Sequence, residues 1–328
     1  MNCGDVVKIL RHNLNLPSTS YATMFFRNAI IYKIGQLPSH ADFEAALQSH
    51  AFVEPTSIEE GSSGLVQPRA DSGLVYVCNR QWLLQFKTCK KLMPKAYINK
   101  VTKARAAELK EQQGFPPGKK QTKEIKEQVI QELLPVAMPI DSSFYAWIDP
   151  VNGWLVVDVA SASKAEALLK VLFKAVSKFP LETLRTTMSP ASAMTDWIVS
   201  DEAPSGFTVD QNAELKSTGH GKGRVRYVNQ TLDVADTRRH IEAGKQCTKL
   251  ALTWGDKVSF TLHENASLRS IAPLDVLKND NAVDARNDEE RFMGEFTLMT
   301  GEMHQLISAL IDSLGGLLKN EEPLQQAA

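Results

Sequence analysis

The spacing of apolar positions predicts a set of short antiparallel strand pairs. Apolar residues alternate with polar ones, or form short runs between turn residues, in segments 74–77 and 82–86, 144–149 and 154–159, and 225–228, 247–254 and 258–262. Asn79-Arg80 lies near the first turn, and Asn152-Gly153 in the second is a strong hairpin signal. These segments predict antiparallel hairpins, with an earlier strand over residues 24–32.

Helices are expected between these strands. Residues 41–48 predict one helix, and residues 54–71 are predicted to be rich in loop. Ser163-Lys164-Ala165-Glu166 has the form of a capping box that opens a helix running through Val176. A C-terminal helix has apolar positions from Leu306 to Leu314 and is broken at Gly315-Gly316. The chain is therefore predicted to be α+β, with largely antiparallel sheets and flanking helices.

Residues 95–139 predict a helical finger that projects from the body. The segment Gly114-Phe115-Pro116-Pro117-Gly118 separates two helices, and the second ends before Pro135. Each helix has only a narrow apolar stripe, which consists of Tyr97, Val101, Ala104 and Leu109 in the first and Ile125, Val129 and Leu133 in the second. Helices with so little apolar surface cannot be buried in the body, so we expect this pair to form a protruding tip.

The charge of the 328-residue chain is divided unevenly. The net charge is −1, yet residues 87–126 hold twelve Lys or Arg against three Glu, and residues 216–249 hold eight basic against three acidic residues. The rest of the chain is therefore strongly acidic. Such a division predicts basic surfaces on an acidic body, which attract polyanions locally. Lysine-rich helices that merely keep the protein in solution are the alternative for the first block.

The most informative segment is 238–254, which carries Arg238, Arg239, Lys245 and Lys249 with Glu242 as its single carboxylate. From Cys247 onward the residues alternate, which predicts that Cys247, Lys249, Ala251 and Thr253 face one way. Leu250, Leu252 and Trp254 then face the core with Thr248. A lysine among small side chains leaves room for a large partner. No acid, base or nucleophile accompanies it, so this segment indicates a binding surface.

The sequence gives no enzyme signature. Gly219-His220-Gly221-Lys222-Gly223-Arg224 matches neither phosphate-binding glycine motif, and a flexible basic turn that touches a nucleic-acid backbone is the favoured interpretation. The seven histidines and four cysteines show no metal-ligand spacing. Asp288-Glu289-Glu290 leaves a metal-dependent nuclease open as an alternative, although a solvated helix or loop is favoured. We expect no catalytic residue, no metal and no cofactor.

The chain also shows no sign of export or membrane insertion. No apolar run approaches the roughly 18 residues of a membrane-spanning helix, and the N-terminus lacks the basic start and apolar stretch of a signal peptide. The four scattered cysteines favour reduced thiols. These features predict a cytoplasmic protein.

Several segments, taken in order, resemble the RdgC family of recombination-associated bacterial DNA-binding proteins. The resembling segments are Phe26-Arg27-Asn28, Leu133-Leu134-Pro135, Trp147-Ile148-Asp149-Pro150-Val151-Asn152-Gly153, Ala160-Ser161-Ala162, Thr195-Asp196-Trp197, Ala213-Glu214-Leu215-Lys216-Ser217, 240–254, Leu298-Met299-Thr300-Gly301-Glu302 and Leu314-Gly315-Gly316. The resemblance covers about residues 24–318. Residues 1–23 are expected to be a disordered extension, and residues 319–328 a polar tail.

The resemblance implies a horseshoe-shaped subunit and a homodimeric ring. The positively charged hole of such a ring encircles duplex DNA without sequence preference, and the family restrains RecA-type recombinases by occupying DNA. A nucleoid-associated location follows from this role. The physics agrees, because non-specific duplex binding requires only phosphate neutralisation on a rigid frame.

The resemblance also assigns expected roles to individual residues. DNA contacts are expected from Lys216, Arg226, Lys245 and Lys249, which match basic positions of the family, and from Arg27, where the family has lysine. Further contacts are expected from the tip lysines Lys100, Lys119, Lys120 and Lys123 and from Lys222 and Arg224 in the basic turn. The dimer interface is expected at Val136, Met138, Asn229 and Gln230. Val136, Met138 and Asn229 depart from the family pattern. A protein-binding scaffold that docks acidic partners remains a second alternative.

Overall fold

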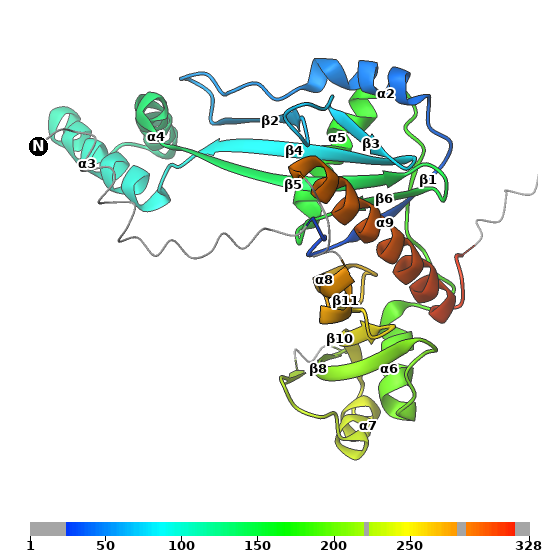
Figure 1. Cartoon of the computed structure of the whole chain (residues 1–328). Helices are drawn as coiled ribbons and strands as arrows, with labels where there is room; N and C mark the ends of the chain where they lie inside the picture. Colours follow the sequence, from blue (N-terminus) through cyan, green and yellow to red (C-terminus); the bar gives the residue numbers. More distant parts are fainter. Residues whose placement is uncertain (1–23, 220–222, 281–286, 319–328) are drawn as a thin grey trace, which may run out of the picture.

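The computed structural model describes residues 24–219, 223–280 and 287–318. In this part the protein is an α+β structure, in which two antiparallel sheets share one core beneath a long helix and a pair of helices extends from the larger sheet (Figure 1). The predicted fold class is therefore confirmed. The predicted extension at residues 1–23 and the tail at 319–328 lie outside the described residues.

The larger sheet has seven strands in the order β2-β4-β5-β6-β1-β7, and β3 also pairs with β4. Its strands are β1 (Ile30–Ile34), β2 (Gly61–Val66), β3 (Val75–Cys78), β4 (Gln81–Lys91), β5 (Pro139–Asp149), β6 (Trp154–Val157) and β7 (Leu181–Thr183). The two predicted hairpins are present as β3–β4 and β5–β6. At the first turn Asn79 and Arg80 both have positive φ, 50° and 65°, which matches the right-handed twist of the flanking strands.

Alternation along the central strands of the larger sheet fills two separate cores. Leu83 and Trp147 belong to one core, while their neighbours Leu84 and Ile148 belong to the other. The second core is closed by α2 (His40–Leu47), which continues as a 3-10 turn (Gln48–His50), and by α5 (Ala162–Ala175). The central part of the sheet is thus buried on both faces, which explains the continuous apolar runs 82–84 and Trp154–Val157.

The smaller sheet has five strands in the order β12-β11-β10-β8-β9, all antiparallel. Its elements are β8 (Phe207–Ser217), β9 (Arg224–Tyr227), β10 (Lys245–Trp254), β11 (Val258–His263) and β12 (Leu268–Pro273), with α6 (Pro190–Ser200), α7 (Val234–Glu242) and α8 (Asp275–Asp280) around it. Ala193 and Met194 of α6 are buried in the same core as Leu250 and Leu252 of β10. One face of this sheet therefore packs against the core, and the opposite face does not.

The long helix α9 (Asp288–Ser313) packs against both sheets. Its buried residues Phe296, Met299, Met303, Leu306 and Leu310 recur every three or four positions and form one apolar stripe. The helix begins where the side chain of Asn287 accepts a hydrogen bond from the backbone N–H of Glu290 at 2.8 Å.

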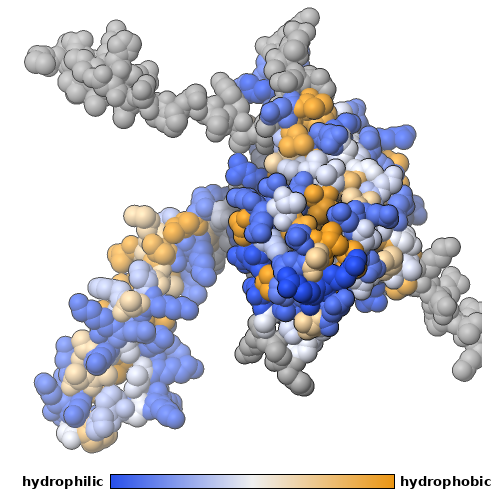
Figure 2. All heavy atoms as spheres, turned by 90° about the horizontal axis from the view of Figure 1, so that it is seen from below, coloured by the Kyte–Doolittle hydropathy of each residue, from blue (hydrophilic) through white to orange (hydrophobic). Residues whose placement is uncertain are grey.

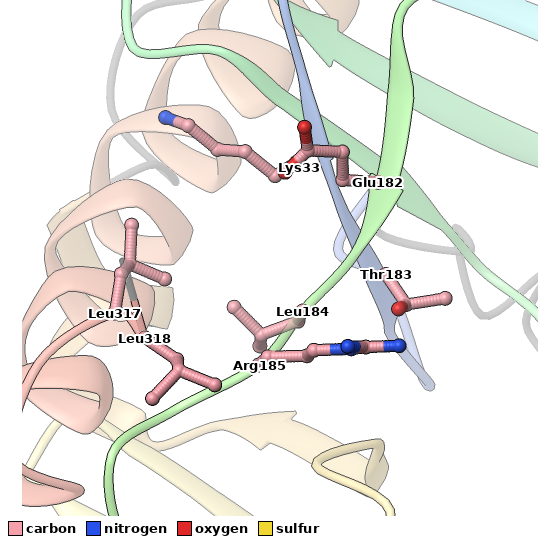
Figure 3. A pocket seen from close by; sticks show the side chains of 7 residues that line it. All are labelled: Lys33, Glu182, Thr183, Leu184, Arg185, Leu317 and Leu318. Carbon is pink, nitrogen blue, oxygen red and sulfur yellow. The ribbon is translucent and has the colours of Figure 1, made fainter. Parts of the chain in front are cut away.

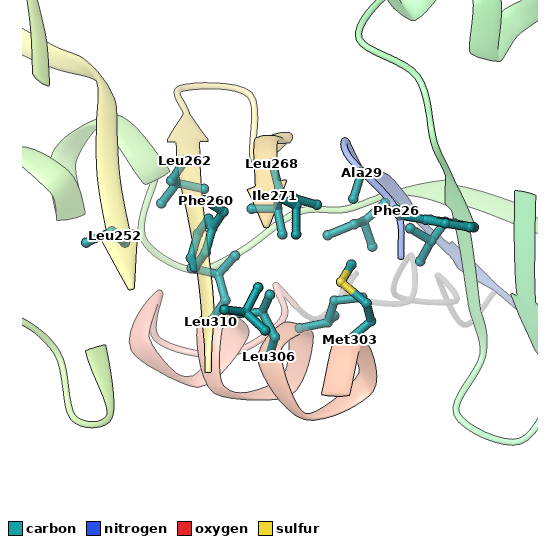
Figure 4. Packing of buried hydrophobic residues seen from close by; sticks show 14 of the residues in the cluster. Phe26, Ala29, Leu252, Phe260, Leu262, Leu268, Ile271, Met303, Leu306 and Leu310 are labelled. Carbon is teal, nitrogen blue, oxygen red and sulfur yellow. The ribbon is translucent and has the colours of Figure 1, made fainter. Parts of the chain in front are cut away.

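The core beneath α9 joins residues from both sheets. It contains Trp147 of the larger sheet together with Phe260 and Leu262 of the smaller one. Phe26 and Ala29, from the segment that leads into β1, fill the space between the two sheets (Figure 4). The two sheets are therefore held by one continuous hydrophobic core.

The projecting finger consists of α3 (Lys95–Gln113), α4 (Lys119–Leu133) and a 3-10 turn (Leu134–Val136), carried by the long strands β4 and β5 (Figure 1). Among its residues only Ile98, Thr102, Val129 and Leu134 are buried. Arg105 also donates two hydrogen bonds, of 2.8 and 2.6 Å, to the carboxylate of Glu132. The core is as small as the narrow apolar stripes predicted, and Val129 of the second stripe lies in it. The stripe predicted for the first helix is wrong, because α3 buries Ile98 and Thr102 rather than Tyr97, Val101, Ala104 and Leu109.

The prediction of loop over residues 54–71 is wrong in its middle, where β2 pairs with β4. The glycines hide this strand from pattern analysis, but they also permit it. A Cβ at Gly61 would collide with the carbonyl oxygen of Cys89, and one at Gly64 would lie 2.6 Å from Cα of Phe52. Close backbone approach explains why a strand of low intrinsic propensity forms here.

Three predicted boundaries also differ from the structure. The N-cap of α5 is Ser161 rather than Ser163, and the two hydroxyls bond each other at 2.7 Å, so the predicted capping box is absent. The strand predicted over residues 24–32 starts at Ile30, and the preceding Ala29 pairs with Leu268 of the smaller sheet instead. The C-terminal helix begins at Asp288, much earlier than its apolar end suggests.

Replacing Leu306 with Ala should lower the free energy of unfolding by about 2–5 kcal/mol, because the side chain is fully buried between the two sheets. Urea denaturation measures this loss. The matched control is Met293→Ala on the exposed part of the same helix, which should change stability by less than about 0.5 kcal/mol. Equal effects of the two substitutions would contradict the role assigned to the shared core.

Candidate nucleic-acid interface

The face of the smaller sheet that lies opposite the core carries a row of charged side chains, and we call it the open face. In the strand register His263 of β11 lies opposite Lys249 of β10, Lys249 lies opposite Glu214 of β8, and Glu214 lies opposite Arg226 of β9. Directly opposed residues point to the same side of a sheet. The four side chains therefore form one line across four strands.

A β-bulge at Thr248 creates this line. Cys247 pairs with Leu215, and an unbroken ladder would next place Thr248 opposite Glu214. The register instead shifts, so that Lys249 takes that position. The Thr248 hydroxyl donates to the Glu214 carbonyl oxygen at 3.2 Å, which fixes the bulge.

The strict alternation predicted for residues 247–254 is therefore wrong at its start. The bulge reverses the side on which Cys247 lies, and its thiol is buried in the core with Leu250 and Leu252. Lys249 remains on the face opposite these leucines, as predicted.

Three cations converge on one oxygen of Glu214. Its Oε2 lies 2.9 Å from Arg226 Nη2, 3.4 Å from Lys249 Nζ and 3.6 Å from Arg224 Nη1. The Glu214 side chain is only 5% exposed, whereas those of Arg224 and Arg226 are 51% and 59% exposed. We call these four residues the Glu214 cluster. It places positive charge outward over a buried carboxylate.

The charges of the cluster also shift the pKa of Glu214 and of the neighbouring His263. Burial disfavours the charged form of Glu214, but the hydrogen bonds and charges of Arg226 and Lys249 outweigh burial and hold the pKa of this carboxyl below the ordinary value of 4.5. Burial, together with the charges of Lys249 and Arg269, lowers the pKa of His263 below 6.5. His263 is therefore mostly neutral at pH 7, and the cluster carries a net charge of about +2.

Other predicted contact residues lie near this cluster or apart from it. Lys216 is exposed in the next row of the open face, opposite Arg224. Lys245 lies opposite Ser217 and so on the other face, where its Nζ is 3.3 Å from His240 Nδ1. Lys222 lies outside the described residues. The structure thus brings Lys216, Arg224, Arg226 and Lys249 together, but separates Lys245 from them.

Arg27 lies at the junction of the two sheets. Its backbone N–H and that of Asn28 donate to Asp158 Oδ1 at 3.2 and 2.8 Å. The neighbouring Val159 accepts a hydrogen bond from Arg269, a residue of the open face that the sequence pattern did not single out. The Arg27 side chain is exposed beside this junction.

The predicted tip lysines lie on the finger, away from the open face (Figure 1). Lys100, Lys119 and Lys123 are among them. Lys123 is paired with Glu127 at 3.6 Å, and both side chains are largely exposed. Exposed pairs of this kind contribute little, so the finger lysines keep most of their capacity to attract anions.

Two exposed regions contain the predicted interface residues. Val136 and Met138 are 79% and 71% exposed, and Leu92 and Ile140 are exposed beside them, with Leu92 N–H donating to Met138 O at 2.8 Å. Apolar surface gathers along the finger near the body (Figure 2). Such a patch on a polar finger is typical of a contact surface.

The second region is the loop after β9. The backbone N–H groups of Asn229 and Gln230 donate to Asn212 Oδ1 at 3.1 Å and Gln211 O at 3.2 Å, at an irregularity of β8. Asn229 adopts a positive φ of 50°, and the neighbouring Val228 is exposed. This loop is therefore pinned to the sheet while its side chains remain accessible.

The structure offers little for the nuclease alternative. Asp288, Glu289 and Glu290 form the first turn of α9, where Asp288 pairs with Arg291 at 2.7 Å. Within residues 24–219, 223–280 and 287–318, no group of His, Cys, Asp and Glu side chains could hold a metal ion. The same part of the chain has no helix long and apolar enough to cross a membrane.

A pocket beside β7 is lined by both charged and apolar side chains. Its lining consists of Lys33, Glu182, Thr183, Leu184, Arg185, Leu317 and Leu318 (Figure 3). Lys33 Nζ donates to Asn152 O at 2.8 Å and lies over the Trp154 ring. These contacts hold the Lys33 side chain beside the β5–β6 turn and Trp154.

An α+β body with a basic sheet face and a basic finger has the features of a protein that binds a polyanion. Comparison with known proteins narrows this class. A family model described as "RdgC: Putative exonuclease, RdgC" matches residues 24–317. This chain belongs to the RdgC family.

Close relatives carry the name "Recombination-associated protein RdgC". The protein of Herminiimonas arsenicoxydans is 50% identical over 295 residues, which cover 89% of this chain and 98% of the relative. That of Janthinobacterium sp. (strain Marseille) is 51% identical with the same coverage. That of Burkholderia orbicola (strain MC0-3) is 47% identical over 307 residues, covering 93% and 99%. The predicted family resemblance is confirmed.

The charge of Glu214 should make stability depend on acid pH. Because its folded pKa is depressed, the stabilisation is present above the unfolded value and is lost as pH falls through the folded pKa. Between about pH 5 and pH 3, the melting temperature of the unmodified protein should therefore fall by more than that of Glu214→Gln. Parallel pH profiles would argue against a stabilising ion cluster.

Proposed function

We propose that this protein binds duplex DNA without sequence preference and restrains RecA-type recombination by occupying the DNA. The Glu214 cluster carries the proposal, because it presents several cations from one rigid sheet face. Phosphates are the ligands that such a surface suits, and they require no base-reading element. Membership of a family whose relatives are named as recombination-associated supports the same role. The protein would then be associated with the nucleoid.

The proposed DNA complex is a homodimeric ring of two horseshoe-shaped subunits. The open face would line the hole, with Arg27 beside it, and the finger lysines Lys100, Lys119, Lys120 and Lys123 would add contacts near the tips. Val136 and Met138 would form one interface, and Asn229 and Gln230 the other. A ring of this kind must open to load on circular DNA and should slide off free linear ends.

Binding to duplex DNA should depend strongly on salt. If a dimer neutralises about 6 phosphates, log K should fall with log salt at a slope of about −5. Titration of random duplexes by fluorescence anisotropy at several salt concentrations measures this slope. A slope near zero, or more than roughly tenfold preference between random duplexes, would reject phosphate-based binding.

Replacing Lys249 or Lys245 with Ala tests which side of the sheet meets the DNA. Each lysine that contacts a phosphate should reduce the salt slope by about 1 and weaken binding to all duplexes equally. Because the two lysines lie on opposite faces, a change in Lys249→Ala alone would assign the contact to the open face. A reduced salt slope in both variants would mean that DNA lies across the end of the sheet, where both lysines can reach it.

The matched control is Lys170→Ala on α5, which removes the same charge from an exposed site beside the larger sheet. Melting curves check that each variant is folded. Inhibition of recombinase strand exchange should fall in parallel with DNA affinity. Normal DNA affinity and a normal salt slope in both Lys245→Ala and Lys249→Ala would show that neither lysine contacts DNA. Lost DNA binding with full inhibition would indicate that the protein contacts the recombinase directly.

Replacing Met138 with Asp should open one dimer interface, since a charge there cannot be buried without a partner. Light scattering at micromolar concentration should then show a weaker or open dimer, while the melting temperature stays close to that of the unmodified protein. Val53→Asp is the control, because Val53 is equally exposed on the body. A monomeric unmodified protein would exclude the ring.

A metal-dependent nuclease is the alternative function, since the description of the family model includes the words "Putative exonuclease". Incubation of labelled duplex DNA with the protein and Mg²⁺ or Mn²⁺ separates the two functions. Binding without cleavage is expected. Cleavage that disappears in Asp288→Asn would favour the nuclease.

A further inference from the structure

A carboxylate at the centre of the open face is unexpected, if that face meets DNA. Glu214 removes one positive charge from the surface, and burying it costs free energy unless it is paired. A basic surface that needed only net charge would do better with a neutral residue. The position of Glu214 therefore indicates a role other than its contribution to the net charge of the open face.

The geometry of the cluster indicates that role. Arg224, Arg226 and Lys249 come from three sites on two strands, yet all approach the same oxygen, Oε2. Long basic side chains have many rotamers, and a ligand that binds them must offset the loss of this rotamer entropy when nothing orders them beforehand. One shared acceptor orders all three before any ligand arrives.

The pairing leaves most donors of these cations free for a second partner. A guanidinium has five N–H groups and an ammonium three, and each contact with Glu214 occupies one nitrogen. Glu214 lies beneath the three cations, since its side chain is almost fully buried and theirs are a third to more than half exposed. The remaining donors therefore lie on the outer side, where a phosphate can reach them.

We propose that Glu214 is a positioning residue, which holds Arg224, Arg226 and Lys249 side by side as a preorganised phosphate-binding surface. This inference rests on the proposed function, because it takes the polyanion to be duplex DNA. The bulge at Thr248 contributes to this arrangement. It places Lys249 opposite Glu214, and the Thr248 hydroxyl donates a hydrogen bond to the backbone carbonyl oxygen of Glu214.

The variant Glu214→Gln tests the proposal, because two explanations predict opposite signs. If Glu214 merely reduces the positive field, its neutralisation should tighten DNA binding and steepen the salt slope. If it positions the cations, binding should weaken about tenfold despite the added positive charge, since their ordering must then occur on binding. The matched control is Glu264→Gln on the turn after β11. It removes the same charge from an exposed residue and should tighten binding slightly.

A second variant, Glu214→Asp, keeps the net charge and draws the carboxylate back by one methylene. Positioning predicts weaker binding here too, whereas a purely electrostatic role predicts no change. Anisotropy titrations give the affinities, and melting curves show that each variant is folded at the assay temperature.

The outcomes separate this inference from the proposed function. Weaker binding of both folded variants supports it. Tighter binding of Glu214→Gln, or unchanged binding of Glu214→Asp, overturns it while the DNA-binding function stands. If neither variant folds, Glu214 serves the fold and the inference is also overturned. Failure of the unmodified protein to bind duplex DNA overturns the proposed function itself.

Discussion

The whole structure depends on the burial of one helix stripe against two sheets. Phe296, Met303 and Leu306 of α9 are fully buried, and the core around them contains Trp147 from the larger sheet and Phe260 from the smaller one. The free energy gained by burying apolar surface is roughly proportional to the area buried. Because this core is continuous, one sheet cannot leave it without exposing apolar surface of the other. The position of the open face relative to the finger is thus set by apolar packing, beside which Lys257 pairs with Glu302 of α9 at 2.9 Å.

The basic surface is as much a product of backbone geometry as of composition. The strands of the smaller sheet alternate sides along most of their length, and at Thr248 one extra residue changes which side chain lies opposite Glu214. β-bulges commonly redirect side chains near functional sites, and this bulge turns a lysine toward a buried acid. The same shift buries the Cys247 thiol, whose pKa rises to about 12 through burial, so that it is not a reactive nucleophile.

The basic side chains of the finger and those of the open face differ in how they are held. The finger keeps a small buried core and presents lysines that have few tight partners, while the open face presents cations that are anchored to a buried carboxylate. A mobile lysine attracts polyanions at long range, whereas an anchored arginine loses less entropy when it binds one. The two basic blocks seen in the sequence are therefore physically different surfaces.

The sequence by itself determined the α+β class, the hairpins at Asn79-Arg80 and Asn152-Gly153, the finger, the basic blocks and the family, because these follow from local patterns or from ordered motifs. It could not reveal β2, whose glycines need the neighbouring backbones of Phe52 and Cys89 to explain them. Nor could it identify Glu214, which in the sequence is one acid among many. Only the tertiary structure decided that Lys249 lies beside Glu214 and that Lys245 lies on the other face. A one-residue bulge reverses the side of every earlier residue in its strand, and a bulge is fixed by pairing between strands that are distant in sequence.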